Sequence, residues 1–133
     1  MKTKIKLLTL SALFCGLFLT TSCQKEKEKE TIVKVKVTTT NGQARPGVTV
    51  YMFRSIKGPT TAFFQPLYAD LQVIAESNGV ATFELHNHRF AKSDLRNGQQ
   101  ATFYFAVLSG SSTFSYQGMT IKEGETKEVS IAY

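Results

Sequence analysis

The sequence predicts an all-β fold, a single antiparallel β-sandwich of about seven strands formed by residues 31–133. Apolar side chains alternate with polar ones along several short segments, which is typical of strands with one buried face. Residues that favour tight turns separate these segments. No segment repeats its apolar residues with the 3.6-residue period of an amphipathic helix.

Each expected strand has a set of apolar residues two positions apart, which places their side chains on one face. The sets are Val33, Val35 and Val37; Val48, Val50 and Met52; Phe83 and Leu85; Phe103, Phe105 and Val107; and Val129, Ile131 and Tyr133. Residues 114–121 form another extended segment. Lys34 and Lys36 alternate with the first set, and we expect them to protect an edge strand from pairing with another chain.

Turn residues stand where these strands end. Asn-Gly pairs occur at 41–42, 78–79 and 97–98, and both residue types tolerate a positive φ. Glycine-containing segments at 110–112 and 123–125 are placed to close the last two hairpins. About 100 residues are enough to build one hydrophobic core of this kind.

The first residues have the organisation of an export signal. Lys2, Lys4 and Lys6 precede an apolar run at 7–19, and the small residue Ser22 stands directly before Cys23. The run is shorter than the roughly 20 apolar residues that a membrane-spanning helix needs. We therefore expect residues 1–22 to be a signal peptide.

Cys23 and the residues beside it favour lipid attachment. Leu19-Thr20-Thr21-Ser22-Cys23 resembles the lipoprotein box of bacteria. The resemblance implies that Cys23 becomes the N-terminus and carries two or three acyl chains, palmitate among them. One acyl chain gives only marginal binding, so several chains would anchor the protein stably to a membrane. The alternative is a secreted protein with an unpaired cysteine.

The segment after Cys23 alternates charges and contains no apolar residue from Gln24 to Glu30. Such a segment buries nothing, so residues 23–30 are expected to form a flexible tether. Lysine and acidic residues in this place also resemble the surface-export signal of Bacteroidetes lipoproteins. That resemblance implies a lipid-anchored protein of the outer membrane, exposed at the cell surface.

Charge and cysteine content narrow the function further. The chain has a formal net charge of +6, but loss of Lys2, Lys4 and Lys6 leaves 13 basic against 10 acidic residues, a net +3. This modest charge gives no reason to expect a nucleic-acid partner. Cys15 leaves with the signal and Cys23 takes the lipid, so the folded part is expected to form no disulfide.

Three segments together resemble a family of sandwich domains. The first is VKVTTTNGQARPGVTVYMF, with Asn41, Gly42, Pro46, Gly47, Val48 and Val50; the others are ESNGVATFEL at 76–85 and TIKEGETKEVSIAY at 120–133. In this order they are similar to transthyretin-like (prealbumin-like) and carboxypeptidase-regulatory-like domains, which have an Ig-like architecture. One branch of these hydrolyses 5-hydroxyisourate and ends in Tyr-Arg-Gly-Ser. This chain ends in Ser130-Ile131-Ala132-Tyr133, so we expect no enzymatic activity.

The two histidines, His86 and His88, are the candidates for a metal site. In a strand, side chains two positions apart point the same way, so both imidazoles could bind one ion. Two histidines alone leave a zinc site short of ligands, and Asn87, Arg89 and Lys92 suggest a solvated loop. We therefore expect no metal and no cofactor.

The connection at 55–70 is long for a sandwich, and long connections are often functional. Its aromatic residues Phe63, Phe64 and Tyr68 are the candidate binding residues. Two alternatives stay open. Phe63 and Leu67 fold back to close one end of the sandwich, or residues 60–65 form an additional edge strand.

The sequence as a whole favours a non-enzymatic binding or assembly module of the cell envelope, whose partner is another envelope protein or a glycan. The alternative is a structural lipoprotein of a type VI-like secretion apparatus, and a small hydrolase of the transthyretin-like branch is a third hypothesis. The fold alone does not decide between them.

Overall fold

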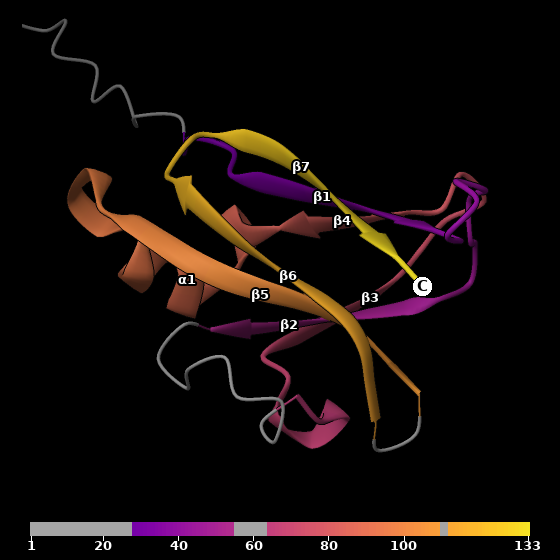
Figure 1. Cartoon of the computed structure of the whole chain (residues 1–133). Helices are drawn as coiled ribbons and strands as arrows, with labels where there is room; N and C mark the ends of the chain where they lie inside the picture. The colour runs from indigo at the N-terminus through magenta and orange to yellow at the C-terminus, as the bar shows by residue number, and fades with distance from the viewer. Residues whose placement is uncertain (1–27, 55–63, 110–111) are drawn as a thin grey trace, which may run out of the picture.

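The computed structural model describes residues 28–54, 64–109 and 112–133, with the side chains of 112–114 excluded (Figure 1). Residues 1–22, which are predicted to be a signal peptide, and Cys23 and Phe63 lie outside the described residues. None of the helices in the described part combines the length and the apolar character needed to cross a membrane.

Seven strands make up most of the fold and confirm the predicted β-sandwich. They are β1 (Ile32–Thr38), β2 (Thr49–Arg54), β3 (Leu71–Ile74), β4 (Val80–Glu84), β5 (Gln100–Ser109), β6 (Ser112–Lys122) and β7 (Thr126–Ala132). The helical elements are η3 (Pro66–Tyr68), η4 (Leu85–Asn87), α1 (Arg89–Asp94) and η5 (Arg96–Gly98).

The strands form two sheets, a three-stranded one in the order β4-β1-β7 and a four-stranded one in the order β3-β2-β5-β6. All neighbouring strands are antiparallel except β1 and β7, which run parallel. The smaller sheet is therefore mixed, which corrects the fully antiparallel expectation. β7, the last strand, pairs with β1, the first strand, and runs in the same direction as β1.

The apolar sets predicted from the sequence meet between the sheets. Val33, Val35 and Val37 of β1 are fully buried and face Val50 and Met52 of β2. Phe83 of β4 packs edge-on against Phe105 of β5, with ring centroids 5.0 Å apart. This close packing across the two layers stabilises the sandwich.

The expectation about the first strand was wrong, and the third strand was not predicted. β1 is the central strand of its sheet, so Lys34 and Lys36 do not protect an edge; they are exposed on the outer face of that sheet. The sequence pattern does not predict β3. In β3, partly buried residues alternate with exposed ones over only four positions. A pattern this short does not distinguish a strand from a loop.

The turn predictions agree with the backbone where it is described. Gly42, Gly79 and Gly124 have φ values of 84°, 76° and 82°. Asn97 has a φ of 61°, at the end of the helical segment rather than in a hairpin. That segment, η4 to η5, replaces the solvated loop expected around Asn87, Arg89 and Lys92.

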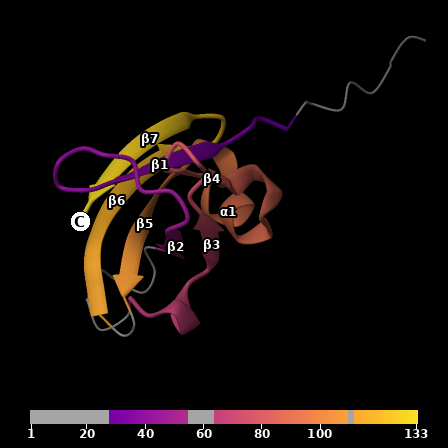
Figure 2. The same cartoon turned by 90° about the vertical axis from the view of Figure 1, so that its right-hand side faces the viewer.

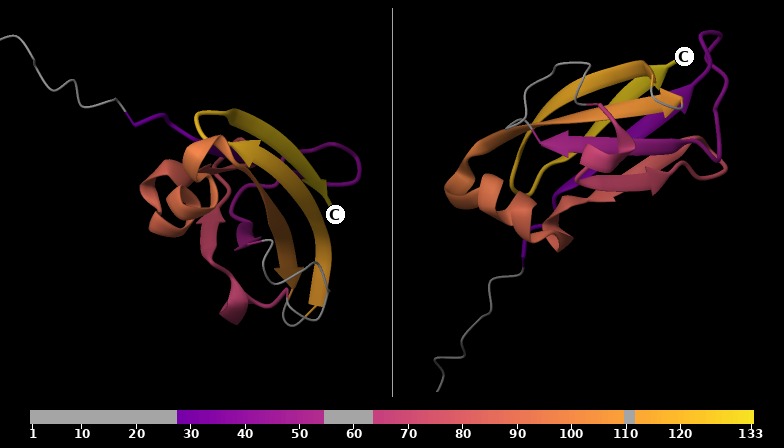
Figure 3. Two further views of the ribbon diagram at one scale, coloured as in Figure 1. Left: turned by 90° about the vertical axis from the view of Figure 1, so that its left-hand side faces the viewer. Right: turned by 90° about the horizontal axis from the view of Figure 1, so that it is seen from below.

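The helical segment closes one end of the sandwich because it has an apolar side of its own. Ala91 is fully buried and Leu95 is 3 % exposed, and both belong to the main core. In the right-hand view of Figure 3, α1 and the first described residues lie at the end opposite the C-terminus. Figure 2 shows β5, β6 and β7 curving along one side, with α1 on the other.

Candidate binding face

The outer faces of the two sheets differ in chemistry. The three-stranded sheet presents Lys34, Lys36 and Glu84, with Glu128 opposite Lys34 on β7. We call this the charged face. Apart from Lys122 at the end of β6, the four-stranded sheet presents aromatic and uncharged residues, and we call this part of it the aromatic face. Its members are Thr49, Tyr51 and Phe53 of β2, Gln72 and Ile74 of β3, Thr102, Tyr104, Ala106 and Leu108 of β5, and Tyr116, Gly118 and Thr120 of β6.

The register of the sheet brings the aromatic rings together. Tyr51 lies opposite Ala106, and Ala106 lies opposite Tyr116 on the next strand. One row away, Phe53 lies opposite Tyr104, which in turn lies opposite Gly118. Each row thus contains one small residue, Ala106 or Gly118, which leaves room for the rings beside it.

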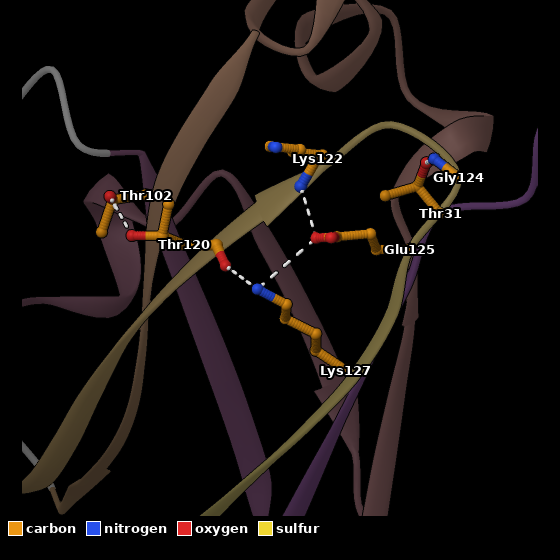
Figure 4. Close-up of polar contacts among 7 residues, drawn as sticks. All are labelled: Thr31, Thr102, Thr120, Lys122, Gly124, Glu125 and Lys127. Atoms are coloured by element: carbon orange, nitrogen blue, oxygen red, sulfur yellow. Dashed lines mark hydrogen bonds and ion pairs between the residues drawn. The ribbon is translucent and has the colours of Figure 1, made fainter. Parts of the chain in front are cut away.

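Gly118 makes room for the ring of Tyr104. A Cβ atom at position 118 would lie 3.1 Å from Cε1 of Tyr104, which is closer than ordinary van der Waals contact. A larger residue here would push the ring away from the sheet. Beside it, Thr102 and Thr120 join their hydroxyl groups at 2.8 Å across β5 and β6 (Figure 4).

Phe64 covers the middle of this face. Its ring centroid lies 5.0 Å from that of Phe53, 4.8 Å from that of Tyr116 and 6.3 Å from that of Tyr104. Phe64 is only 2 % exposed, and with Phe53 and Ala106 it forms a second apolar cluster outside the sheet. Tilted rings at these distances are a favourable aromatic geometry.

The segment after Phe64 projects two apolar residues into solvent. Leu67 is 83 % exposed and Tyr68 is 43 % exposed, both on η3. Asp70 anchors the end of this segment, since its carboxylate accepts the N–H of Arg54 at 2.9 Å and its own N–H donates to the carbonyl of Met52. Phe64 and Asp70 thus fix the two ends of this segment, and the side chain of Leu67 between them projects into solvent.

The candidate binding residues therefore have different positions. Phe64 packs onto the sheet, as aromatic residues usually do, so its ring is not itself presented to a partner. Tyr68 is partly exposed, and Phe63 lies outside the described residues. The alternative in which Leu67 closes one end of the sandwich is wrong, because its side chain is exposed.

Sequence reasoning missed the residues on the sheet itself, Tyr51, Phe53, Tyr104 and Tyr116. The signal was present, because β2 and β5 carry large apolar residues at consecutive positions, as in YMF and FYF. A strand that is apolar on both sides is covered on both sides. The alternation was read for the inner face alone.

The two histidines do not lie in a strand, because His86 is in η4 and His88 is the residue between η4 and α1. Nδ1 of His86 lies 3.3 Å from the backbone nitrogen of Thr31, and the ring of His88 stacks on Phe90 with centroids 5.6 Å apart. Within residues 28–54, 64–109 and 112–133, no group of three or more His, Cys, Asp or Glu side chains is placed to hold a metal ion.

Arg54 joins the end of β2 to α1. Its guanidinium donates to both carboxylate oxygens of Asp94, at 2.8 and 2.6 Å, and lies over the ring of Phe90. The hydrogen bonds with Asp94 raise the pKa of Arg54 further above its ordinary value. This pair fixes the helix against the four-stranded sheet.

Two hollows lie away from the aromatic face. One of about 110 Å³ is floored by Leu85, Ala91 and Leu95 and bordered by Glu28 and Lys92. The other, of about 250 Å³, lies between β3 and β4, with Phe83 at its base and His88 at its edge. Both are smaller than the roughly 300–1,000 Å³ that is usual for small-molecule sites.

No family model matches the chain, and no curated protein matches it.

Proposed function

We propose that this chain is a lipid-anchored protein of the outer membrane, exposed at the cell surface, whose β-sandwich is a non-enzymatic module for binding or assembly. The lipid would be carried by Cys23. The partner would be another envelope component, and it would dock on the aromatic face.

The observation that supports the binding role best is the difference between the two outer faces. An outer face of a sheet normally carries charged and polar side chains, as the charged face does. Among the strand residues that the structure describes, the aromatic face has no charged residue between the row of Thr49 and the row of Thr102, and Leu67 projects beside it at 83 % exposure. Exposed apolar groups next to aromatic rings are typical of contact surfaces.

The size of the hollows supports a macromolecular partner over a small substrate. A flat face with a projecting leucine suits a protein or glycan surface, whereas the hollow of about 250 Å³ between β3 and β4 is small for a substrate. This favours docking over catalysis.

The anchor is tested by lipid labelling in a bacterial host. The wild-type protein should incorporate radioactive palmitate and sediment with membranes, whereas Cys23→Ser should do neither. A Cys23→Ser protein that stays in the membrane fraction would contradict anchoring through this residue.

The docking face is tested by photocrosslinking in intact cells. A photoreactive amino acid at Leu67 should give a discrete adduct, and one at Lys36 on the charged face should not. Equal adducts from both positions would exclude a role for the aromatic face. The identity of the adduct separates an envelope protein from a glycan, and a secretion-apparatus component would support the alternative function.

A further inference from the structure

The first described residues are bound to the body of the fold rather than leading away from it. Thr31 is 1 % exposed, and its hydroxyl accepts the N–H of Gly124 at 2.9 Å (Figure 4). Its carbonyl accepts the N–H of Leu85 at 2.9 Å, and its own N–H faces Nδ1 of His86. Contacts with β6–β7 on one side and η4 on the other fix the position of β1's start.

The residues before Thr31 lie on the same end of the sandwich. The carboxylate of Glu28 is 2.6 Å from the ammonium group of Lys92 on α1. The side chain of Lys29 passes over the β6–β7 turn, because a Cβ atom at Gly124 would lie 3.1 Å from its Cδ. We call this end the tether end; it comprises residues 28–31, the segment from η4 to η5, and the β6–β7 turn.

The length of chain before Glu28 limits how far this end can lie from the lipid. Five residue steps join Cys23 to Glu28, and each spans at most about 3.6 Å, so the reach is about 18 Å. By contrast, the eleven residues of β6 span about 37 Å at roughly 3.4 Å per residue. A lipid on Cys23 therefore brings the tether end, and not the far end, to the membrane.

The tether end has a basic helical surface. Arg89, Lys92 and Arg96 are exposed. Arg89 and Lys92 stand three positions apart on α1 and share one side of this helix, and Arg96 follows in η5, directly after Leu95. Ala91 and Leu95, on the other side, are buried in the core. Among the described residues, Lys92 pairs with Glu28, and neither Arg89 nor Arg96 has an ion pair.

We propose that this basic surface, Arg89, Lys92 and Arg96, lies on the membrane and binds the phosphate groups of lipid heads. The inference rests on the proposed lipid anchor at Cys23. Glu28, which pairs with Lys92, and Glu30 and Glu123 are also exposed at this end, so the attraction comes from the side of the helix and not from net charge. An arginine fork matches phosphate geometry, and each cation near an anionic surface contributes about 1 kcal/mol.

The orientation is tested with a fluorophore on the lipidated protein in vesicles of phosphatidylethanolamine and phosphatidylglycerol. Ser93→Cys places it on α1, and the matched Ser130→Cys places it on the charged face, beside Lys36. Both serines are exposed, and Cys23 itself is blocked by lipid. A nitroxide on the lipid headgroups should quench the label at 93 more strongly than the label at 130.

The contribution of the cations is measured with the lipid-free Cys23→Ser variant and the same vesicles. Arg89→Gln plus Arg96→Gln should weaken vesicle binding by roughly 5-fold for each cation removed. Lys34→Gln plus Lys36→Gln removes the same charge from the charged face and should leave binding unchanged. Equal losses in both double variants would show that net charge, rather than this surface, attracts the membrane and would overturn the proposal.

The outcomes separate this inference from the proposed function. If the protein is anchored and position 93 is quenched no more than position 130, the inference is wrong and the anchor stands. If the wild-type protein takes up no lipid and leaves the membrane fraction, the proposed function is wrong and the inference falls with it.

Discussion

Gly79 is the residue whose replacement should disturb the fold most directly at a turn. Its φ is 76°, and a Cβ atom would lie 2.8 Å from the carbonyl oxygen of Val37. Gly42 has a similar φ of 84°, with open space around it. It is therefore a matched control for the conformational effect alone.

We expect Gly42→Ala to lower the free energy of unfolding by about 1–2 kcal/mol, the usual cost of a left-handed residue. Gly79→Ala should lower it further, because a backbone oxygen must also move. Urea unfolding followed by circular dichroism measures both variants. Equal midpoints would show that the contact with Val37 relaxes without cost.

Glu125 should make stability depend on pH in the acidic range. Its carboxylate accepts the N–H of Lys122 and lies 3.4 Å from Lys127 (Figure 4). The hydrogen bond from Lys122 lowers the pKa of Glu125 below its ordinary value of 4.5. The unfolded chain then takes up a proton at a higher pH than the folded one, so stability is full above pH 4.5 and falls as the pH drops further.

A Glu125→Gln variant keeps an oxygen acceptor and loses the titrating group. Its free energy of unfolding should therefore fall less steeply than that of the wild type between about pH 5 and pH 3. Urea titrations at several pH values provide the comparison. Parallel curves for the two proteins would show that this carboxylate does not contribute to the acid sensitivity.

Individual residues were predictable where their chemistry acts locally. Asn-Gly pairs and Glu123-Gly124 signalled turns because glycine tolerates a positive φ wherever it stands. The orientation of the two histidine side chains was less predictable, because it depends on whether the chain around them is a strand or a helical turn. His86 contacts Thr31, 55 positions earlier, which no local pattern indicates.

Among the elements, the segment from Phe64 to Asp70 contains two neighbouring apolar residues with opposite roles. Phe64→Ala should lower the free energy of unfolding by about 3 kcal/mol, because a buried ring is removed from a packed cluster. Leu67→Ala should change it by less than about 0.5 kcal/mol, because the side chain is 83 % exposed.

The effect of Leu67→Ala on binding should be large, although its effect on stability is small. Leu67→Ala should lose the partner that Leu67 crosslinks to while the melting temperature stays unchanged. If Leu67→Ala unfolds the protein instead, the Leu67 side chain contributes to stability, and η3 is no contact element.

The helix α1 depends on one partly buried ion pair. Asp94→Ala should cost about 1.5–3 kcal/mol, the usual range for a hydrogen bond to a charged group, because Arg54 is left unpaired. Lys92→Ala removes an exposed ion pair of the same helix and should cost no more than about 0.5 kcal/mol. Thermal unfolding distinguishes them, and similar losses would mean that the helix is held by Ala91 and Leu95 alone.

The two elements that sequence reasoning missed, β3 and α1, have a common physical reason. β3 has four residues and α1 has six, so neither is long enough for its apolar periodicity to be recognised in the sequence. Isolated helices of six residues are unstable in water. Each exists because the rest of the fold offers a partner, β2 for β3 and the open end of the core for α1.

At the scale of the whole molecule, the two ends of the sandwich differ. One end carries the start of β1 and the basic helical surface, and the other carries the C-terminus. The aromatic face runs along the side. A lipid at Cys23 would leave this side open to a partner, which is the arrangement that the proposed function requires.

The sequence by itself determined the class of fold, the inner faces of most strands and the turns between them, because alternation and turn chemistry act over a few residues. It also predicts the lipid anchor at Cys23. Only the tertiary structure decided that β1 is central, that β7 is parallel to it, and that Phe64 covers an aromatic outer face. Those features depend on which strands become neighbours, and that choice is made by contacts between residues far apart in the chain.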